Sequence, residues 1–353
     1  MIFQNYSFNY FLLITILWCF FVAHVLYKEL LVFYIEGDED IKNDIIEVLY
    51  EYYRRTGFPH EKLTDEQKTN RMERVIKSKD ILLEEDVLQI NPQGLDLANF
   101  YHPHMMKAFY TNRKDISPYA AYINDDKLKN CIKRWLDLGE VPSPVGIRRI
   151  LKTRNGVRSV TNFKPTISKF IYDTYTKEGD MVLDPCAGYS GRLVGCIAAN
   201  KNLFYHGIDP DGRTATGNMR MAGFFMEQRD SVEYRWKFKF RFDLGCAEDV
   251  MLSLEDGSYN LVFSSPPYWN VEKYSTDSNQ SYLRYPKYDS WRDNFLGRIL
   301  TESVRVVKDG GYIAFNVKNY KKAPIADDLC KIAENLGLRL AKTYQMRLAN
   351  SEF

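Results

Sequence analysis

A short run in the last third of the chain carries residues that could hold a planar substrate. Residues 264–269 read SSPPYW and follow the apolar run YNLVF. Pro266 and Pro267 fix the backbone and lack N–H groups, so the peptide oxygens beside Ser265 remain available as hydrogen-bond acceptors. With the Ser265 hydroxyl, they can accept from an exocyclic amino group. The Tyr268 ring offers a face on which a base can stack, worth about 1–3 kcal/mol. The plain alternative is a Pro-Pro turn with an exposed aromatic side chain.

A glycine-containing turn precedes this run in the chain. Residues 184–193 read DPCAGYSGRL and follow the apolar run MVL. Gly188 and Gly191 let the backbone pass close to a ligand. Asp209 ends the next apolar run and is placed to accept two ribose hydroxyl groups. Such a turn alone fits many nucleotide binders, but the three-glycine dinucleotide fingerprint is absent, which disfavours a nicotinamide or flavin enzyme.

Both motifs need a sheet that brings the ends of their strands together. Strand and helix patterns alternate after residue 180, which predicts an α/β fold with an open, mostly parallel sheet and helices on both faces. Ligands bind at the carboxyl ends of such strands. In residues 233–245, EYRWKFKFRFDLG, basic and aromatic side chains alternate, which predicts an edge strand. The expected strands are 181–184, 204–209, 233–245, 259–265, 310–318 and 336–348.

The pair DPCAGYSGRL and SSPPYW resembles the S-adenosylmethionine-dependent amino-methyltransferases of DNA, the N4-cytosine and N6-adenine group, and most closely their phage-like and bacterial SPPY members. The resemblance covers roughly residues 160–317. It implies a Rossmann-like class I methyltransferase sheet, S-adenosylmethionine as cofactor, no metal, and double-stranded DNA as the partner. The target base would flip out of the duplex.

The resemblance also implies roles for individual residues. Phe163 and Thr166 would touch the methionine end of the cofactor, Asp209 its ribose, and Glu248 its adenine. The full cofactor set is Phe163, Thr166, Asp184, Pro185, Ala187, Gly188, Gly191, Asp209 and Glu248. The catalytic set is Ser265, Pro266, Pro267 and Tyr268. The SPPY form favours N4-cytosine over N6-adenine. The alternatives are a methyltransferase of RNA or protein glutamine, and an inactive, truncated domain retained for binding.

Composition narrows the class of protein. The chain has 353 residues and a net charge of +2, which argues against holding a polyanion by bulk charge alone. The six cysteines form no CxxC pair, so a zinc ribbon or a disulfide framework is not expected. His102 and His104 in HPH lack a third ligand and are interpreted as surface or core histidines. We expect an intracellular, DNA-associated protein. The oligomeric state and a restriction endonuclease partner are not visible in the sequence.

The chain divides into three parts. Residues 1–40 hold an uncharged run at 8–27, whose 20 residues could span a membrane. Its readings are a membrane anchor, which we do not favour, a buried helix, or translation from an upstream false start. Residues 41–150 read as helical, with helices over 41–55, from Thr64 to about Leu83, and over 127–138. Residues 151–353 form the expected catalytic domain, which we expect to lack its last strand.

Two further segments could contact DNA. Residues 146–158, GIRRILKTRNGVR, are basic and contain no acid. They read either as a solvated connection or as a phosphate-contacting segment. The candidate phosphate contacts are Arg148, Arg149, Lys152 and Arg154. Residues 271–292, rich in Tyr, Ser and Asn, read as a mobile lid or a DNA-contacting loop, or else as an ordinary surface loop.

The basic segment generates a first prediction. Replacing Arg149 and Arg154 by Ala should weaken DNA binding and flatten its salt dependence. Each phosphate contact displaces a counterion from the DNA, so the loss of a contact reduces the number of counterions released on binding. The measurement is the affinity for a duplex over a series of salt concentrations. An unchanged salt slope would argue for a solvated connection.

Overall fold

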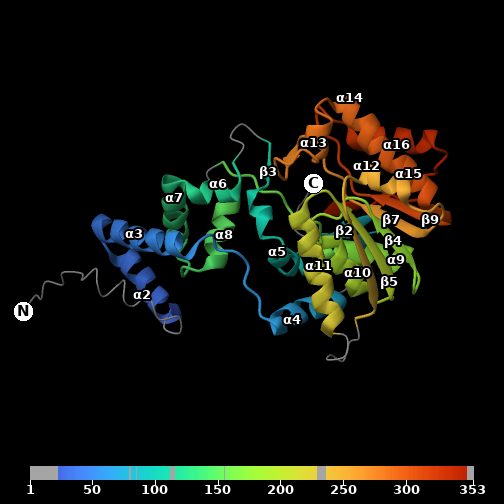
Figure 1. The fold of residues 1–353 in the computed structure, drawn as a ribbon. Coiled ribbons are helices and arrows are strands. Elements are labelled where there is room, and N and C mark those ends of the chain that lie inside the picture. The colour runs from blue at the N-terminus through green and yellow to red at the C-terminus, as the bar shows by residue number, and fades with distance from the viewer. Residues whose placement is uncertain are drawn as a thin grey trace, which may run out of the picture. The chain divides into compact units, whose positions relative to one another are not determined.

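The computed structural model describes residues 23–78, 81–84, 86–111, 116–154, 156–228 and 236–347. They belong to two compact units (Figure 1). One is drawn from Met1–His60 and Met106–Ser159, and the other from Glu61–Met105 and Val160–Phe353. Residues 61–105 therefore group with the later part of the chain. The division at residues 40 and 150 stays a prediction.

The first unit is helical. Its elements are α2 (Ala23–Glu36), α3 (Glu39–Thr56), β3 (Phe109–Tyr110), α6 (Pro118–Ile123), α7 (Asp125–Leu136) and α8 (Pro144–Thr153). Asp38 caps the start of α3, since its side chain accepts from the Ile41 N–H at 3.0 Å, and Gly57, where φ is 80°, follows its last residue. Helices α3 and α7 confirm the helices predicted over 41–55 and 127–138. At Gly146 of α8 a Cβ would lie 2.0 Å from the Trp135 ring, so glycine permits close packing on α7.

The second unit is built on a parallel sheet. Its strands are β4 (Met181–Asp184), β5 (Leu203–Asp209), β6 (Phe238–Leu244), β7 (Tyr259–Ser264) and β9 (Val307–Phe315). They lie in the order β6-β5-β4-β7-β9, and every neighbouring pair is parallel. The first of these strands in the sequence, β4, lies in the middle of the sheet. The next two strands are added on one side of it and the last two on the other, as in Rossmann-like doubly wound sheets. The predicted α/β class is confirmed, and β6 lies at an edge as its charge pattern predicts.

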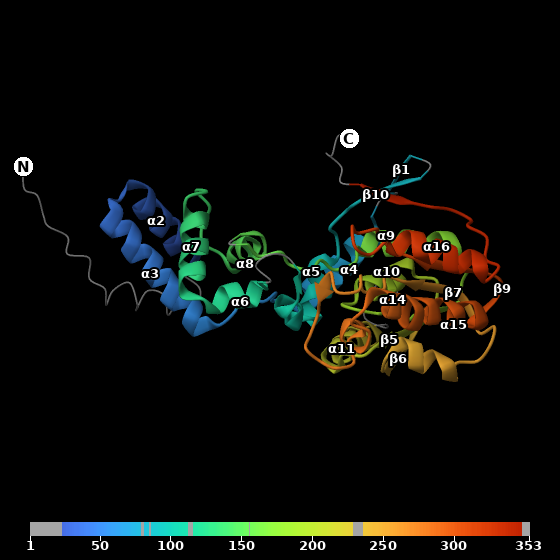
Figure 2. The ribbon, with the colours of Figure 1, turned by 90° about the horizontal axis from the view of Figure 1, so that it is seen from above.

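Helices cover both faces of this sheet (Figures 1 and 2). Alternate residues of β4 point to opposite sides, so Val182 joins one core and Leu183 the other. The Val182 side is covered by α4 (Asp65–Ile76), α5 (Leu95–Tyr101), α9 (Pro165–Tyr175), α10 (Gly191–Ala199) and α11 (Gly212–Glu227). The Leu183 side is covered by α12 (Ala247–Val250), α14 (Tyr288–Trp291), η4 (Arg292–Gly297), α15 (Arg298–Val306) and α16 (Ile325–Asn335).

The expected sixth strand over 336–348 is wrong for this sheet. In the described part of the chain, β10 (Gln345–Arg347) pairs with β2 (Val87–Gln89), which in turn pairs with β1 (Leu82–Glu84). Leu88 of β2 packs on Ile167 of α9, so this small sheet lies beside α9 (Figure 2). Leu340 is 72% exposed, and residues 338–344 form no strand.

Two other expectations need correction. The capping box of Thr64 and Gln67 is present, but α4 ends at Ile76 instead of near Leu83. The segment 271–292 is not an irregular loop throughout. After β8 (Glu272–Lys273) it forms α13 (Ser281–Arg284) and α14. Trp291 of α14 is fully buried and donates to Ser281 Oγ at 3.1 Å, so the second half of this segment belongs to the packed core.

The remaining short elements are η1 (Pro103–Lys107) and η3 (Met251–Ser253). None of the helices in the described ranges is both long and apolar enough to cross a membrane. The uncharged run over 8–27 lies mostly outside those ranges, so its three readings are unchanged.

The packing of α11 against His102 generates a second prediction. A Cβ on Gly217 would lie 2.4 Å from the His102 ring and 2.6 Å from the Tyr101 carbonyl oxygen. Gly217→Ala should therefore lower the free energy of unfolding by about 1–3 kcal/mol. Gly223 in the same helix has open space around it. Gly223→Ala should be neutral or stabilise by up to about 1 kcal/mol, because alanine is the better helix former. Equal effects in urea unfolding would contradict this account of the packing.

Candidate active site

The carboxyl ends of β4 and β7 lie side by side, and Ser264 joins them. Ser264 Oγ donates to Asp184 Oδ1 at 2.8 Å and accepts from the Cys186 N–H at 3.1 Å. The two strands are parallel neighbours, so the chain leaves both at the same edge of the sheet. The structure thus brings together the two motifs on which the sequence argument depends, the glycine turn after Asp184 and the proline corner after Ser264.

Asp184 is fully buried, and its carboxylate binds groups of the protein itself. Besides Ser264, it accepts from Arg192 Nε at 2.7 Å and from Tyr205 OH at 2.6 Å. Arg192 is also buried and donates to the Cys186 carbonyl oxygen. A buried ion pair is tolerated when further hydrogen bonds satisfy its remaining polar atoms. Through these hydrogen bonds, Asp184 holds its neighbours in fixed positions at the carboxyl edge of the sheet.

The glycine turn is held by hydrogen bonds to its backbone. Gly188 has φ of 56°, which glycine adopts without strain. Its N–H donates to Asp209 Oδ2 at 3.0 Å, and its carbonyl oxygen accepts from Asn218 Nδ2 at 2.8 Å. Pro185 and Ala187 are buried within the turn, where the Ala187 N–H donates to the Ile208 carbonyl oxygen at 2.9 Å. The turn is therefore tied to β5 and to α11.

Hydrogen bonds of Ser190 and His102 also hold the glycine turn in place. Ser190 is buried with φ of 63° and donates to Asn218 Oδ1 at 3.0 Å. Because that bond uses the only hydroxyl hydrogen, His102 Nε2, 2.6 Å from Ser190 Oγ, must be the donor. Burial lowers the pKa of His102 well below its usual value, so the ring is neutral. His104 Nε2 lies 3.1 Å from Thr214 Oγ1. Both histidines thus contact buried side chains of the second unit, and the interpretation that HPH binds no metal stays a prediction.

Asp209 lies at the carboxyl end of β5 beside the turn. Its Oδ1 accepts from the Asp211 N–H, and its Oδ2 from the Gly188 N–H, each at 3.0 Å. Burial raises the pKa of Asp209 to about 7, although the two N–H groups favour the carboxylate. Each carboxylate oxygen keeps a lone pair, so the pair can still accept two hydroxyl groups from a ligand.

Residues before β4 pack directly on the turn. A Cβ on Gly191 would lie 2.2 Å from the Phe163 carbonyl oxygen, so glycine is required there for contact within the chain. This contact accounts for the glycine at position 191, and the approach of a ligand to Gly191 stays a prediction. The Phe163 ring faces Arg192, with 5.4 Å between the guanidinium carbon and the ring centre. Thr166 is buried and donates to the Asn91 carbonyl oxygen at 3.2 Å.

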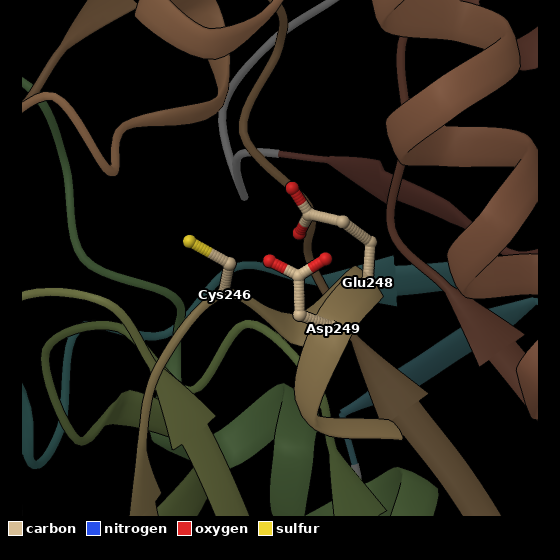
Figure 3. Close-up of side chains that lie close together, drawn as sticks. All are labelled: Cys246, Glu248 and Asp249. Atoms are coloured by element: carbon tan, nitrogen blue, oxygen red, sulfur yellow. The ribbon is translucent and has the colours of Figure 1, made fainter. Parts of the chain in front are cut away.

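Glu248, on α12 after β6, carries an unsatisfied buried oxygen. It is 1% exposed; Oε1 accepts from Arg284 Nη1 at 2.5 Å, and Oε2 has no hydrogen-bond partner. Burial raises its pKa. The ligand atoms of Cys246, Glu248 and Asp249 lie within 4.8 Å of one another (Figure 3). Arg284 also pairs with Asp249 at 2.9 Å, so a guanidinium already binds both carboxylates, and we assign no metal to them.

At the proline corner, one side chain binds the hydroxyl groups of both Ser265 and Tyr268. Asn316 Nδ2 donates to Ser265 Oγ at 3.0 Å and to Tyr268 OH at 2.8 Å. Pro266 is buried and Pro267 half-buried between these two residues. Burial raises the pKa of Tyr268 to about 12, so the phenol stays protonated. Sequence reasoning missed Asn316. The available signal was its place directly after a strand, at the carboxyl edge of the sheet.

The four basic residues proposed for DNA lie on α8 or directly after it, in the helical unit. Arg148 is only 7% exposed and donates to the Pro59 carbonyl oxygen at 2.6 Å, so it stabilises its own unit. Arg149 is paired with Glu140 at 2.6 Å, with both side chains about half exposed. Contacts of Arg149, Lys152 and Arg154 with phosphate stay a prediction.

The bridge through Ser264 generates a third prediction. Ser264→Ala would leave the Cys186 N–H and one oxygen of Asp184 unsatisfied in a buried site, which should cost about 1–3 kcal/mol in the free energy of unfolding. The control is Ser303→Ala. Ser303 is equally buried, but its hydroxyl donates to the Ile299 carbonyl oxygen of its own helix at 2.7 Å, so its loss should be nearly neutral. Denaturant unfolding of both variants compares the two; similar losses would argue against the bridge.

Comparisons with known proteins are distant. No family model and no curated protein matches the chain. Similar solved structures include an arsenic(III) S-adenosylmethionine methyltransferase from Chlamydomonas reinhardtii, at 20% identity and a TM-score of 0.32, over 46% of this chain and 53% of that one. Phosphoethanolamine N-methyltransferase 2 from Haemonchus contortus, in complex with S-adenosyl-L-methionine, has 16% identity and a TM-score of 0.30, over 49% and 37%. The [4+2]-cyclase SpnF has 13% identity and a TM-score of 0.32, over 49% and 56%. The chain thus spans about half or less of each, and TM-scores near 0.3 leave the reaction to be argued from the site.

Proposed function

We propose that the chain is an S-adenosylmethionine-dependent methyltransferase that acts on the exocyclic amino group of a base flipped from double-stranded DNA, with N4 of cytosine favoured over N6 of adenine. The observation that carries the proposal is the bridge through Ser264. It ties the glycine turn to the corner that holds Ser265 and Tyr268. A donor bound at the turn and an acceptor bound at the corner would therefore meet at one edge of the sheet.

The residues around the turn suit the cofactor. When bound, S-adenosylmethionine supplies a methyl group on a sulfonium, an activated carbon that needs no metal. The Asp209 carboxylate keeps lone pairs for the two ribose hydroxyl groups. The buried, unpartnered Oε2 of Glu248 suits an amino donor such as that of adenine. Phe163 lies against the turn through Gly191 and would flank the methionine end.

The corner suits a weakly nucleophilic amine. The lone pair of an exocyclic amino group is delocalised into its ring. Hydrogen bonds from that group to Ser265 Oγ and the Pro266 carbonyl oxygen favour a more tetrahedral nitrogen with its lone pair turned toward the methyl donor. Alignment is then the main catalytic effect, and it can supply several of the roughly 7–11 kcal/mol available from preorganisation.

A base within a duplex cannot reach this corner. Flipping it out costs a few kcal/mol. Stacking on the Tyr268 ring would offset part of that cost. Arg149, Lys152 and Arg154 are the proposed phosphate contacts that would hold the duplex itself.

Analysis of DNA from cells with and without the expressed chain tests the proposal. The DNA is digested to nucleosides, and the modified nucleoside is identified by mass spectrometry. N4-methylcytosine or N6-methyladenine that depends on expression supports it. Methylation confined to RNA or to protein glutamine would replace DNA by that substrate. Absence of any methylated product, together with no heat of S-adenosylmethionine binding in calorimetry, would indicate an inactive domain.

A fourth prediction concerns the corner. The double variant Ser265→Ala with Tyr268→Ala should abolish methyl transfer and leave cofactor binding largely intact, because the acceptor and the stacking ring are lost while the turn is unchanged. Methyl transfer is measured with labelled S-adenosylmethionine, and binding by calorimetry.

The control variant is Ser258→Ala. Ser258 directly precedes β7, at the opposite end of the same strand, and its hydroxyl donates to the Glu255 carbonyl oxygen at 2.7 Å. It should retain full activity. Activity retained by the double variant would remove Ser265 and Tyr268 from the reaction.

A further inference from the structure

Asn316 occupies a distinctive place beside the proline corner. It directly follows β9, and its N–H donates to the Ser264 carbonyl oxygen at 2.9 Å, continuing the pairing of Phe315 with Ser264. The backbone of Asn316 is therefore fixed next to β7. From this fixed point its side-chain amide reaches the two hydroxyl groups that follow Ser264.

The hydrogen bonds of the amide can be accounted for one by one. Nδ2 has two hydrogens, and they are donated to Ser265 Oγ at 3.0 Å and Tyr268 OH at 2.8 Å. Each hydroxyl oxygen has two lone pairs and one hydrogen. Asn316 takes one lone pair from each, so Ser265 keeps a lone pair for an incoming amine. The same amide thus holds Ser265 Oγ and the Tyr268 ring in one fixed relation without consuming the acceptor.

We infer that Asn316 is a positioning residue for methyl transfer, which sets the amine acceptor of Ser265 and the stacking ring of Tyr268 relative to each other. The inference rests on the proposed function. Pairing between β9 and β7 does not require this side chain, because the backbone N–H of Asn316 supplies the bond to Ser264. A purely structural role therefore predicts little effect from its removal.

The first test is Asn316→Ala. It retains the backbone bond to Ser264 and removes the side-chain donor from both hydroxyl groups, while Tyr268 OH keeps its 3.5 Å bond to the backbone carbonyl oxygen at position 316. We expect kcat to fall by about 10- to 100-fold, from the loss of two neutral hydrogen bonds that align the reacting groups. The cofactor affinity from calorimetry should be unchanged. A kcat equal to that of the wild type would overturn the inference.

A matched control lies three residues away. Asn319 donates to Asp327 Oδ1 at 2.7 Å and accepts from the Ala326 N–H at 2.8 Å, and neither partner belongs to the corner. Asn319→Ala should keep the wild-type kcat. An equal fall of kcat in both variants would show that any side chain after β9 matters, and would overturn the specific role of Asn316.

The isosteric variant Asn316→Asp adds a readout that a structural role would not change. The introduced carboxylate, when ionised, only accepts hydrogen bonds and cannot donate to either hydroxyl group. When protonated it regains one O–H donor. Relative to the wild type, the kcat of Asn316→Asp should therefore rise as the pH falls from about 8 toward the ordinary aspartate pKa of about 4, whereas the relative kcat of Asn316→Ala should not depend on pH. Because the shape is kept, this variant also serves if Asn316→Ala does not fold. Parallel pH profiles would contradict the inference.

A double-mutant cycle tests whether Asn316 acts through its partners. Tyr268→Phe removes the hydroxyl group that Asn316 binds and keeps the ring. The combined variant should lose less activity than the product of the two single losses, because both remove the same hydrogen bond. Independent effects would overturn the inference. If the wild type transfers no methyl group to any substrate, the proposed function fails and the inference with it. If the wild type is active and Asn316→Ala is equally active, the inference alone fails.

Discussion

The candidate active site depends on one buried carboxylate. Asp184 accepts from Ser264, Arg192 and Tyr205, and these donors come from β7, α10 and β5. An isolated charge at this depth would cost several kcal/mol, so the three donors and the acid must be present together. Because the donors come from three elements, satisfying the charge fixes how those elements meet. The positions of the turn and the corner follow from that requirement.

The loops at the carboxyl edge of the sheet are consequently connected to one another by side-chain hydrogen bonds. Asn218 contacts both the Gly188 carbonyl oxygen and Ser190, and Asn316 contacts both Ser265 and Tyr268. In each case one amide fixes two neighbouring groups. Such doubly used side chains restrict the shape of irregular backbone, which carries no ladder of its own.

Local sequence patterns predict the strands of the sheet well, because the physical signal is local. MVL and LVF are continuous apolar runs, as expected for strands buried on both faces, and they form most of β4 and the centre of β7. The alternating charge of β6 marks an edge. The features that escape prediction depend on distant partners. Arg148 reads as a phosphate contact until its bond to Pro59 is known, and β10 reads as a sixth strand until its pairing with β2 is known. The importance of Asn316 depends on the register between β9 and β7, which the sequence does not encode locally.

Residues 61–105 precede the sheet by a long stretch of chain, yet they complete it. Met72, Val75 and Leu97 fill the core beside β4, and His102 supports Ser190 behind the glycine turn. The sheet and the helices that follow residue 160 therefore do not bury their core without residues 61–105. An evolutionary exchange that carried residues 160–353 into another protein would import an uncovered apolar surface and a turn without its histidine brace. The unit is thus built from two separated stretches of the chain, and only residues 106–159 of the helical unit lie between them in the sequence.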